Sequence, residues 1–367
     1  MIDVDELLGT AMQMGASDVH LAVPACPTFR SCNSLVPASD EALTPMLVKE
    51  VFESITTEKQ QETFYQDLEL DFAYSISGTG RFRVNASLQR GSIALTFRCL
   101  PLRIPTLDDL GLPDICKSLI VKRKGLVLVT GPTSSGKSTT QAAMIDYLNE
   151  RESRKVLTVE DPVEFLHSNK KCLIVQRDLG DDTTSFAAAM RHALRQNADV
   201  ILVGEMRDVE TTSAAITAAE TGHLVLATAH TQGAANVIDR LISEFPPAQQ
   251  EQARTQFALV LEAVLSQALV PRADGRGRVA AVEVMIANYA IRNLIREKKV
   301  HQIPAVIETS SQEGMINLDQ ALAELVGRNV VALEDALLRS QRPEELQRFF
   351  VSQSSSRRRA DNAGARV

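Results

Sequence analysis

Tryptophan is absent from this chain of 367 residues, and aromatic side chains make up only 4% of it. Proteins that bind single-stranded nucleic acid stack bases on aromatic rings, and this chain has few rings to offer. Acidic residues outnumber basic ones, 46 to 39, which gives a net charge of −7 and no general attraction to nucleic acid or anionic lipid. We therefore expect no nucleic acid among its partners.

Long apolar runs and paired cysteines are missing as well. No stretch approaches the ~18 apolar residues of a membrane-spanning helix, and the N-terminal residues lack the basic segment and apolar core of a signal peptide. The five cysteines are odd in number, scattered and never in CxxC spacing: Cys26, Cys32, Cys99, Cys116 and Cys172. This pattern predicts reduced thiols rather than disulfides or a zinc site, so we expect a cytoplasmic protein.

The pattern that is present changes near residue 100. Residues 3–16 and 44–66 carry apolar side chains at helical spacing, and each range is predicted to be one helix. Residues 68–100 alternate apolar and polar side chains and contain glycine turns, which is typical of a meander of strands. We therefore predict a small α+β domain over residues 1–100, followed by a proline-containing linker over 101–111.

From residue 112 onward, strand and helix patterns alternate, as expected for a parallel sheet flanked by helices. The strand candidates are short and rich in Val and Leu, as buried parallel strands are, and lie at 125–130, 156–160, 200–204 and 223–229. Beyond about residue 248 the pattern is mostly helical, apart from a predicted hairpin within 267–285. We predict an α/β domain over 112–351 and a disordered, Ser- and Arg-rich tail over 352–367.

The most specific signal is GLVLVTGPTSSGKST at residues 125–139, which holds a complete P-loop pattern, GxxxxGK[ST], between a strand-like and a helix-like run. In such a loop the backbone N–H groups surround phosphate oxygens, the lysine reaches the β- and γ-phosphates, and the hydroxyl after it suits Mg²⁺. An ordinary Gly/Ser turn would not explain Lys137 and Ser138. We predict nucleotide binding by Gly131, Pro132, Thr133, Ser134, Ser135, Gly136, Lys137, Ser138 and Thr139, with Ser138 on the metal.

Carboxylates follow two of the predicted strands. Glu205 ends the apolar run 200–204, and Glu160 ends the run 156–160. Since ligands bind at the carboxyl ends of strands in α/β folds, both are candidates for the activation of water or the support of Mg²⁺. Glu164 belongs to the same cluster as Glu160, and this clustering favours a site over a solvated loop.

Two histidines and two arginines are further candidates. His223 and His230 bracket one predicted strand, and His230, at its carboxyl end, is better placed to contact a γ-phosphate. Arg81 and Arg83 share one face of a strand in the N-terminal domain. They are either a solvated edge or arginine fingers that act on another subunit's nucleotide.

Together these motifs resemble the type IV pilus retraction ATPases, the PilT family of secretion ATPases. The resemblance covers roughly residues 1–350. It rests on GASDVHL (15–21), RFRVN (81–85), GPTSSGKST (131–139), VEDPVEF (159–165), ILVGEMRD (201–208), TAAETGHLVLATAHT (217–231) and AIRNLIRE (290–297). Several such motifs in one order are far more specific than any one of them.

The resemblance implies a PAS-like N-terminal domain, a RecA-like ATPase domain and a ring-shaped homohexamer that hydrolyses ATP with Mg²⁺. It implies pilus retraction and twitching motility, driven from the cytoplasmic face of the inner membrane through a pilus platform protein, with a paralogous retraction ATPase as a further partner. It assigns site roles as follows: Glu205 polarises the attacking water, Glu160 and Glu164 form the Asp box, His223 and His230 form the His box, and Arg81 and Arg83 reach a neighbour's nucleotide.

The chain also departs from the family pattern. The N-terminal segment lacks the usual Asp-Gly turn, and QGAAN at 232–236 replaces a more Thr/Ser-rich stretch. Ser134 stands where the family more often has glycine, a small change that should be tolerated if φ is negative at this position. The C-terminal segments also resemble the accessory retraction ATPase, PilU, so an accessory ATPase or a nucleotide-binding ring subunit remains the alternative. AIRNLI at 290–295 favours the retraction motor itself.

Overall fold

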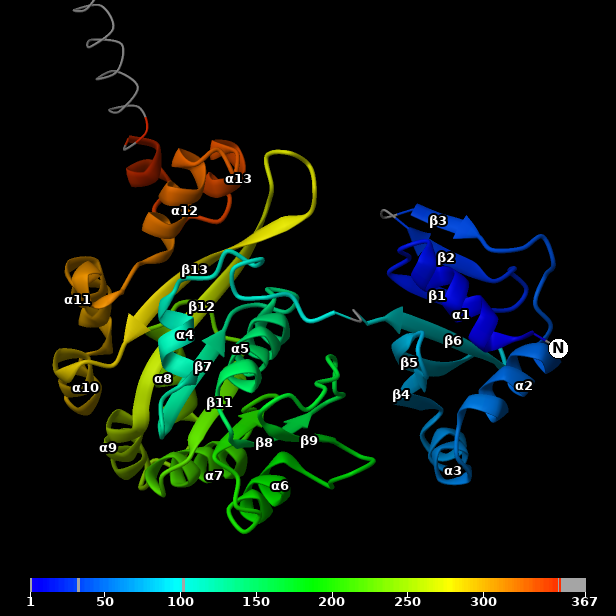
Figure 1. Ribbon diagram of the computed structural model, residues 1–367, viewed down its shortest axis with the longest axis horizontal. Coiled ribbons are helices and arrows are strands. Elements are labelled where there is room, and N and C mark those ends of the chain that lie inside the picture. The colour runs from blue at the N-terminus through cyan, green and yellow to red at the C-terminus, as the bar shows by residue number, and fades with distance from the viewer. Residues whose placement is uncertain (1, 32–33, 101–102, 349, 351–367) are drawn as a thin grey trace, which may run out of the picture. The chain divides into compact units, whose positions relative to one another are not determined.

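The structure is a computed structural model, shown in Figure 1, and it describes residues 2–31, 34–100, 103–348 and 350. Contacts divide the chain into two compact units. The first runs to Ile104 and includes Asp161–Leu166, and the second comprises the rest. The predicted tail 352–367, Cys32 and the start of the predicted linker lie outside the described residues. Within the described ranges, no helix is long and apolar enough to cross a membrane.

The first unit contains a six-stranded antiparallel sheet with the order β3-β2-β1-β6-β5-β4. Its strands are β1 Asp18–Leu21, β2 Thr28–Ser31, β3 Ser34–Pro37, β4 Glu69–Ile76, β5 Gly80–Gln89 and β6 Ser92–Cys99. The meander predicted within 68–100 is confirmed, because it matches β4, β5 and β6. The strands β2 and β3 were not predicted, since both are short and β3 is exposed along its whole length.

Three helices complete this unit: α1 Val4–Gln13, α2 Pro45–Ile55 and α3 Glu58–Asp67. The prediction of one helix over 44–66 was wrong, because the backbone is extended at Thr56. Thr57 then starts α3 with a capping box, in which its side chain accepts from the Gln60 N–H and Gln60 reaches back to the Thr57 N–H. Both helices bury apolar side chains, including Phe52 and Phe64, against the core.

The second unit contains a seven-stranded sheet with the order β13-β12-β7-β11-β10-β8-β9. Its strands are β7 Gly125–Thr130, β8 Lys155–Glu160, β9 Leu173–Asp178, β10 Val200–Val203, β11 Leu224–Ala229, β12 Leu261–Pro271 and β13 Arg278–Ile286. All neighbours pair in parallel except β12 and β13, which form the predicted hairpin. The four predicted strands are confirmed. The edge strand β9 was missed because most of its residues are only partly buried.

Helices cover both faces of this sheet. They are α4 Ile115–Ile120, α5 Lys137–Arg151, α6 Phe186–Ala193, α7 Val209–Glu220, α8 Asn236–Ser243, α9 Gln250–Val260, α10 Tyr289–Arg296, α11 Ile303–Thr309, α12 Leu318–Gly327 and α13 Leu333–Leu337. Along β7, Leu126 and Leu128 belong to one apolar cluster, whereas Val127 and Val129 belong to another on the opposite face. A strand buried on both sides explains the uninterrupted apolar run in the sequence.

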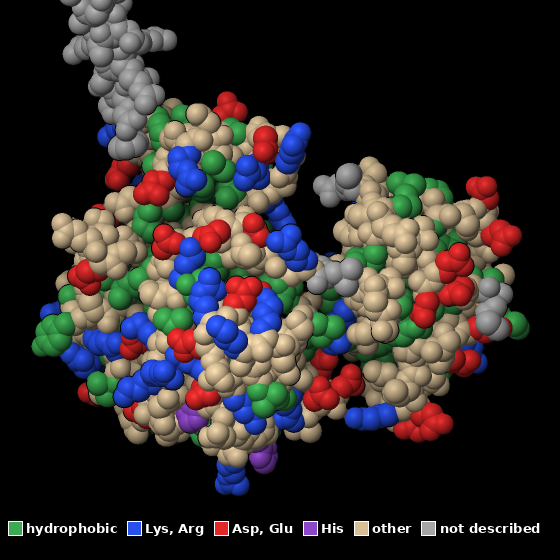
Figure 2. All heavy atoms as spheres, viewed as in Figure 1, with side chains coloured by type: hydrophobic (Ala, Val, Ile, Leu, Met, Phe, Trp, Pro, Cys, Tyr) green, Lys and Arg blue, Asp and Glu red, His purple; other side chains and the backbone are tan. Residues whose placement is uncertain are grey.

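The second unit is therefore an α/β domain with a largely parallel sheet, as predicted. On the face shown in Figure 2, acidic and basic side chains are intermingled over this unit. The carboxyl ends of β7, β11, β10 and β8 share one edge of the sheet, and the candidate site is built there.

Candidate functional site

The P-loop connects β7 to α5. Gly131 has φ +141°, and a Cβ at this position would collide with the carbonyl oxygen of Gln267 on β12. Gly136 has φ +89° and precedes the first residue of α5. Glycine at both positions lets the backbone turn tightly, so the N–H groups of the loop and of the first turn of α5 are available to a bound anion.

Ser134 adopts a left-handed conformation, with φ +63°. The negative φ under which serine was expected to be tolerated here is therefore not what the structure shows. An L-residue in this region is strained by about 1–2 kcal/mol, because its Cβ lies too close to the following carbonyl oxygen. The chain thus carries local strain in its phosphate loop.

Lys137 is almost fully buried, with 8% of its surface exposed. Its Nζ donates to the carbonyl oxygens of Gly131 and Pro132, each at 2.9 Å, and lies 3.4 Å from Nδ1 of His230. The ammonium group is therefore held inside the turn of the loop, between the loop backbone and the residue that ends β11. Ser138 and Thr139 follow it in the first turn of α5.

Glu205 and His230 are brought together because β10 and β11 are parallel neighbours. Oε1 of Glu205 lies 2.7 Å from Nε2 of His230, and Oε2 lies 2.5 Å from Nε of Arg207. Burial alone would raise the pKa of Glu205, but the hydrogen bonds from Arg207 and His230 outweigh it and hold this pKa below its usual value. Glu205 is thus an ionised carboxylate at neutral pH, linked through His230 to Lys137.

Glu160 ends β8 at the same edge of the sheet, where Oε1 accepts from the Thr158 hydroxyl at 2.8 Å. Glu164 lies in the segment Asp161–Leu166, which belongs to the first unit. There the Arg81 Nε donates to the Val163 carbonyl at 3.0 Å. Glu160 and Glu164, although close in the sequence, therefore belong to different units.

Arg81 and Arg83 lie on one face of β5, as predicted, and the residues between and beside them on the other face are buried. The Arg81 Nη1 donates to the Ser75 hydroxyl at 3.2 Å, and the Arg83 Nε lies 4.0 Å from Asp71. Both arginines are held on the face of the sheet opposite to the core of the first unit.

His223 lies at the other end of β11, next to the start of β7, where its carbonyl accepts from the Gly125 N–H at 3.0 Å. Its Nδ1 lies 3.0 Å from the Ala218 carbonyl oxygen and 3.3 Å from the Thr221 hydroxyl. Because β7 and β11 are parallel, His223 is at the edge of the sheet opposite to the P-loop. Within one chain, the structure does not bring His223 to Lys137.

Some polar residues of the site were missed from the sequence. Arg207 was not singled out, although a cation two residues after the strand-end Glu205 was a usable signal. Thr130, Ser266 and Glu283 contact the loop after His230 and were missed too. For Glu283 the signal was a carboxylate within the apolar run AAVEVM.

Comparison with known proteins identifies the family. The family described as "Type II/IV secretion system protein" matches residues 107–292. The "Type IV pilus retractation ATPase PilT" of Pseudomonas aeruginosa is 44% identical over 343 residues, which is 94% of this chain and 99% of the relative. The chain belongs to the PilT family of secretion ATPases. The family predicted from the sequence motifs is thus confirmed, and the chain is a P-loop ATPase.

Two further relatives of the family agree with this assignment. The "Type IV pilus ATPase PilU" of Pseudomonas aeruginosa is 36% identical over 355 residues, which is 97% of this chain and 93% of the relative. A crystal structure of the pilus retraction motor PilT with bound ADP has a TM-score of 0.88 at 43% identity, covering 95% of this chain and all of that one. The α/β fold predicted from the sequence is therefore the fold of this family.

Proposed function

We propose that this chain is the ATP-hydrolysing subunit of a homohexameric motor that powers type IV pilus retraction, and with it twitching motility. The observation that carries the proposal is the continuous polar chain Lys137–His230–Glu205–Arg207 at the end of a complete P-loop. The likeness to PilT over 94% of the chain supports the biological process.

In this proposal the P-loop backbone and Lys137 hold the β- and γ-phosphates of ATP. Glu205 polarises the attacking water. In the structure, Arg207 contacts one carboxylate oxygen of Glu205 and His230 contacts the other. With ATP bound, both side chains would turn toward the γ-phosphate, and the carboxylate would then be available to the water. Glu160, one strand further along the sheet, supports the metal and its waters.

Mg²⁺ fits the donors available here. No group of three or more His, Cys, Asp or Glu side chains in the described part of the chain forms a metal site of its own. Magnesium usually keeps several waters and binds through few protein ligands plus substrate phosphates. The Ser138 hydroxyl, at the start of α5, is the protein ligand we propose, and the ion would neutralise charge on the β- and γ-phosphates.

The remaining predicted residues are proposed to act between subunits. Arg81 and Arg83 of one subunit would contact the nucleotide of its neighbour, with Glu164 of the same unit beside the metal. His223, at the edge of the sheet opposite to its own P-loop, is assigned to the same shared site. A ring that closes around ATP would then convert binding into movement of its subunits.

The proposed setting is the cytoplasmic face of the inner membrane, where the ring would engage a pilus platform protein. A second candidate function is that of an accessory retraction ATPase that assists a paralogous motor. The 36% identity to PilU over 97% of the chain supports this second candidate function. Retraction in cells that contain this chain and no other retraction ATPase would support the motor, and dependence on a second ATPase would support the accessory role.

The site is tested by turnover of ATP by the purified full chain. Lys137→Ala should abolish binding, whereas Glu205→Ala should retain binding of ATP and lose hydrolysis. Wild-type turnover no higher than that of Lys137→Ala would refute the proposed site, and so would loss of binding in Glu205→Ala. Mixing Arg81→Ala with Lys137→Ala subunits should partly restore activity, because some interfaces then hold both intact groups.

A further inference from the structure

The loop that follows His230 is fastened to the sheet by side chains of three strands. The Thr130 hydroxyl of β7 donates to the Thr231 carbonyl. On β12, the Ser266 hydroxyl accepts from the Gly233 N–H at 3.0 Å, and on β13 a Glu283 oxygen accepts from the Ala234 N–H at 3.3 Å. Ser266 and Glu283 stand directly opposite each other in the hairpin, so they act on adjacent residues of the loop.

Glu283 is an unusual residue for its place in the fold. It is 6% exposed and lies between Val282 and Val284, which are also buried. Burial, with a smaller contribution from Asp319, raises its pKa to about 7, while the hydrogen bond from Ala234 acts in the other direction. A buried carboxylate of this kind destabilises the fold when it is ionised, so a purely structural position would favour an apolar side chain.

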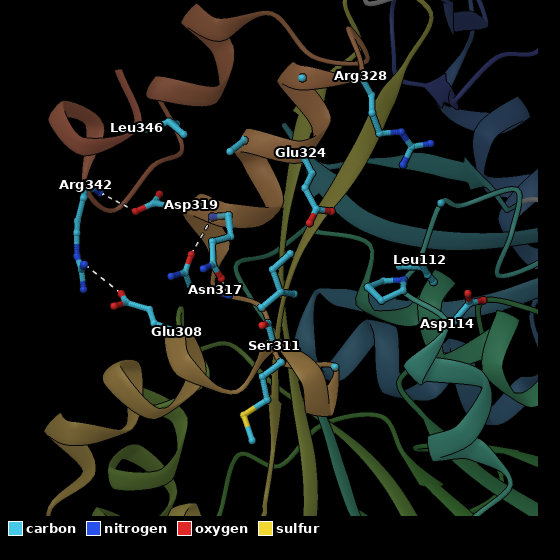
Figure 3. Close-up of a pocket in the computed structure, with 18 of the residues that line it drawn as sticks. Leu112, Asp114, Glu308, Ser311, Asn317, Asp319, Glu324, Arg328, Arg342 and Leu346 are labelled. Carbon is cyan, nitrogen blue, oxygen red and sulfur yellow. Dashed lines mark hydrogen bonds and ion pairs between the residues drawn. The ribbon is translucent and has the colours of Figure 1, made fainter. Parts of the chain in front are cut away.

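Asp319, on α12, is the ionisable group whose charge acts on Glu283. Figure 3 shows it at the start of this helix, on the wall of a groove that Glu324 and Arg342 also line. Its two carboxylate oxygens accept from the N–H groups of Gln341 and Arg342, at 2.9 and 3.1 Å. Asp319 thus accepts hydrogen bonds from the segment after α13, whereas Glu283 accepts one from the loop after His230.

The turn of this loop requires glycine at position 233. Gly233 has φ +85°, and a Cβ at this position would lie 3.1 Å from Nδ2 of Asn236. His230 begins this loop and must reach both Glu205 and Lys137, at 2.7 and 3.4 Å. A shift of the loop by a fraction of an ångström would therefore lengthen one contact or both.

We propose that Glu283 is a positioning residue for ATP hydrolysis, which holds the Gly233–Ala234 turn together with Ser266 and thereby keeps His230 between Lys137 and Glu205. This inference rests on the role proposed above for His230. The hydrogen bond that the structure records for the Glu283 side chain is to Ala234 and not to the P-loop, so we expect it to affect the chemical step and not the affinity for ATP.

The first test compares two substitutions of Glu283. Glu283→Met fills the space without an acceptor for the Ala234 N–H, and we expect kcat to fall by about 10-fold, since a misplacement of about 1 Å can cost about 100-fold and a smaller shift costs less. The KM for ATP should stay within about 2-fold of the wild type, because the P-loop is untouched. Glu283→Gln keeps an acceptor oxygen and should restore most of kcat.

Controls separate this effect from a general loss of packing. Glu244→Met makes the same change at a partly buried carboxylate at the far end of α8, and kcat should not change. Ser266→Ala removes the neighbouring anchor with a smaller change of volume and should reproduce the loss of kcat. Wild-type kcat in both Glu283→Met and Ser266→Ala, with both proteins folded, would overturn the inference.

The decisive measurement is a double-mutant cycle with His230→Ala. If Glu283 acts through His230, then Glu283→Met should cause no further loss of kcat in the His230→Ala background. An equal fold-loss in both backgrounds would overturn the positioning role. Wild-type activity of His230→Ala alone would instead refute the role proposed for His230, so the two failures are distinguishable.

Discussion

Glu283→Gln should make the second unit more stable at alkaline pH. The pKa of Glu283 is raised to about 7 in the folded chain, from a reference value of 4.5. The folded state therefore holds this proton more tightly than the unfolded state does. The resulting stabilisation is fully present below pH 4.5 and is lost as the pH rises through 7.

The magnitude follows from the same two values. A shift of about 2.5 units, at about 1.4 kcal/mol per unit, corresponds to about 3 kcal/mol of unfolding free energy between the protonated and ionised limits. Glutamine does not titrate, so the variant should lack this decline. Relative to the wild type, its unfolding free energy should rise by about 2.5 kcal/mol between pH 5 and 8, because part of the decline lies below pH 5.

The assay is urea denaturation of the full chain at half-unit steps from pH 5 to pH 8.5, followed by circular dichroism. If the glutamine amide finds no acceptor, the stability of the variant is lowered by the same amount at every pH. Such an offset does not alter the predicted difference in pH dependence between the variant and the wild type. The control is Glu324→Gln on α12, an exposed carboxylate whose removal should change stability by less than about 0.5 kcal/mol. Parallel pH profiles of the wild type and Glu283→Gln would refute the claim that burial raises the pKa of this carboxylate.

Three further predictions concern other parts of the chain. Ser134→Gly should raise the free energy of unfolding by about 1 kcal/mol in thermal denaturation, because φ at this residue is +63°. The control is Asn329→Gly, which should raise it by less, because asparagine tolerates a similar φ. Equal increases in the two variants would argue against strain in the P-loop. Thr57→Ala should lower the stability of the first unit by about 1 kcal/mol through loss of the α3 cap, measured by thermal denaturation against Thr63→Ala within the same helix. Arg207→Gln should raise the pKa of Glu205 and move the acid limb of the kcat profile to higher pH, and an unmoved limb would contradict the pairing.

The parts of the fold that the sequence predicted well are those in which one physical requirement dominates. The strands β7, β8, β10 and β11 must be apolar on both faces, so they appear as short Val/Leu runs. The meander of the first unit has one buried face and shows clear alternation. In contrast, β9 is an edge strand and β3 is exposed throughout, so neither carries a strong pattern.

The failures come from conformations that local residue types do not specify. The helical spacing of 44–66 continues through Thr56 and Thr57, and only the capping box in the structure reveals two helices there. Serine favours a negative φ, yet the loop between Gly131 and Gly136 imposes +63° on Ser134. The anchors Ser266 and Glu283 lie more than 30 residues after the loop that they hold, so spacing in the sequence could not link them.

The order of strands explains why His230 occupies the middle of the candidate site. From sequence position alone, Lys137, Glu160, Glu205 and His230 are simply residues near the ends of four strands. In the sheet the order is β7-β11-β10-β8, with neighbours about 4.8 Å apart. Of these four strands, β11 is the last in sequence, yet it is inserted between the P-loop strand and β10.

This insertion gives each strand-end residue a different neighbour. His230 meets Lys137 on one side and Glu205 on the other, at 3.4 and 2.7 Å, whereas Glu160 lies one strand beyond Glu205. Of the two carboxylates Glu160 and Glu205, Glu205 is thus the one that His230 connects to Lys137 through direct contacts. A movement of the loop at His230 would change one of these contacts or both, which is why the anchors on β12 and β13, outside this row of residues, bear on the chemistry within it.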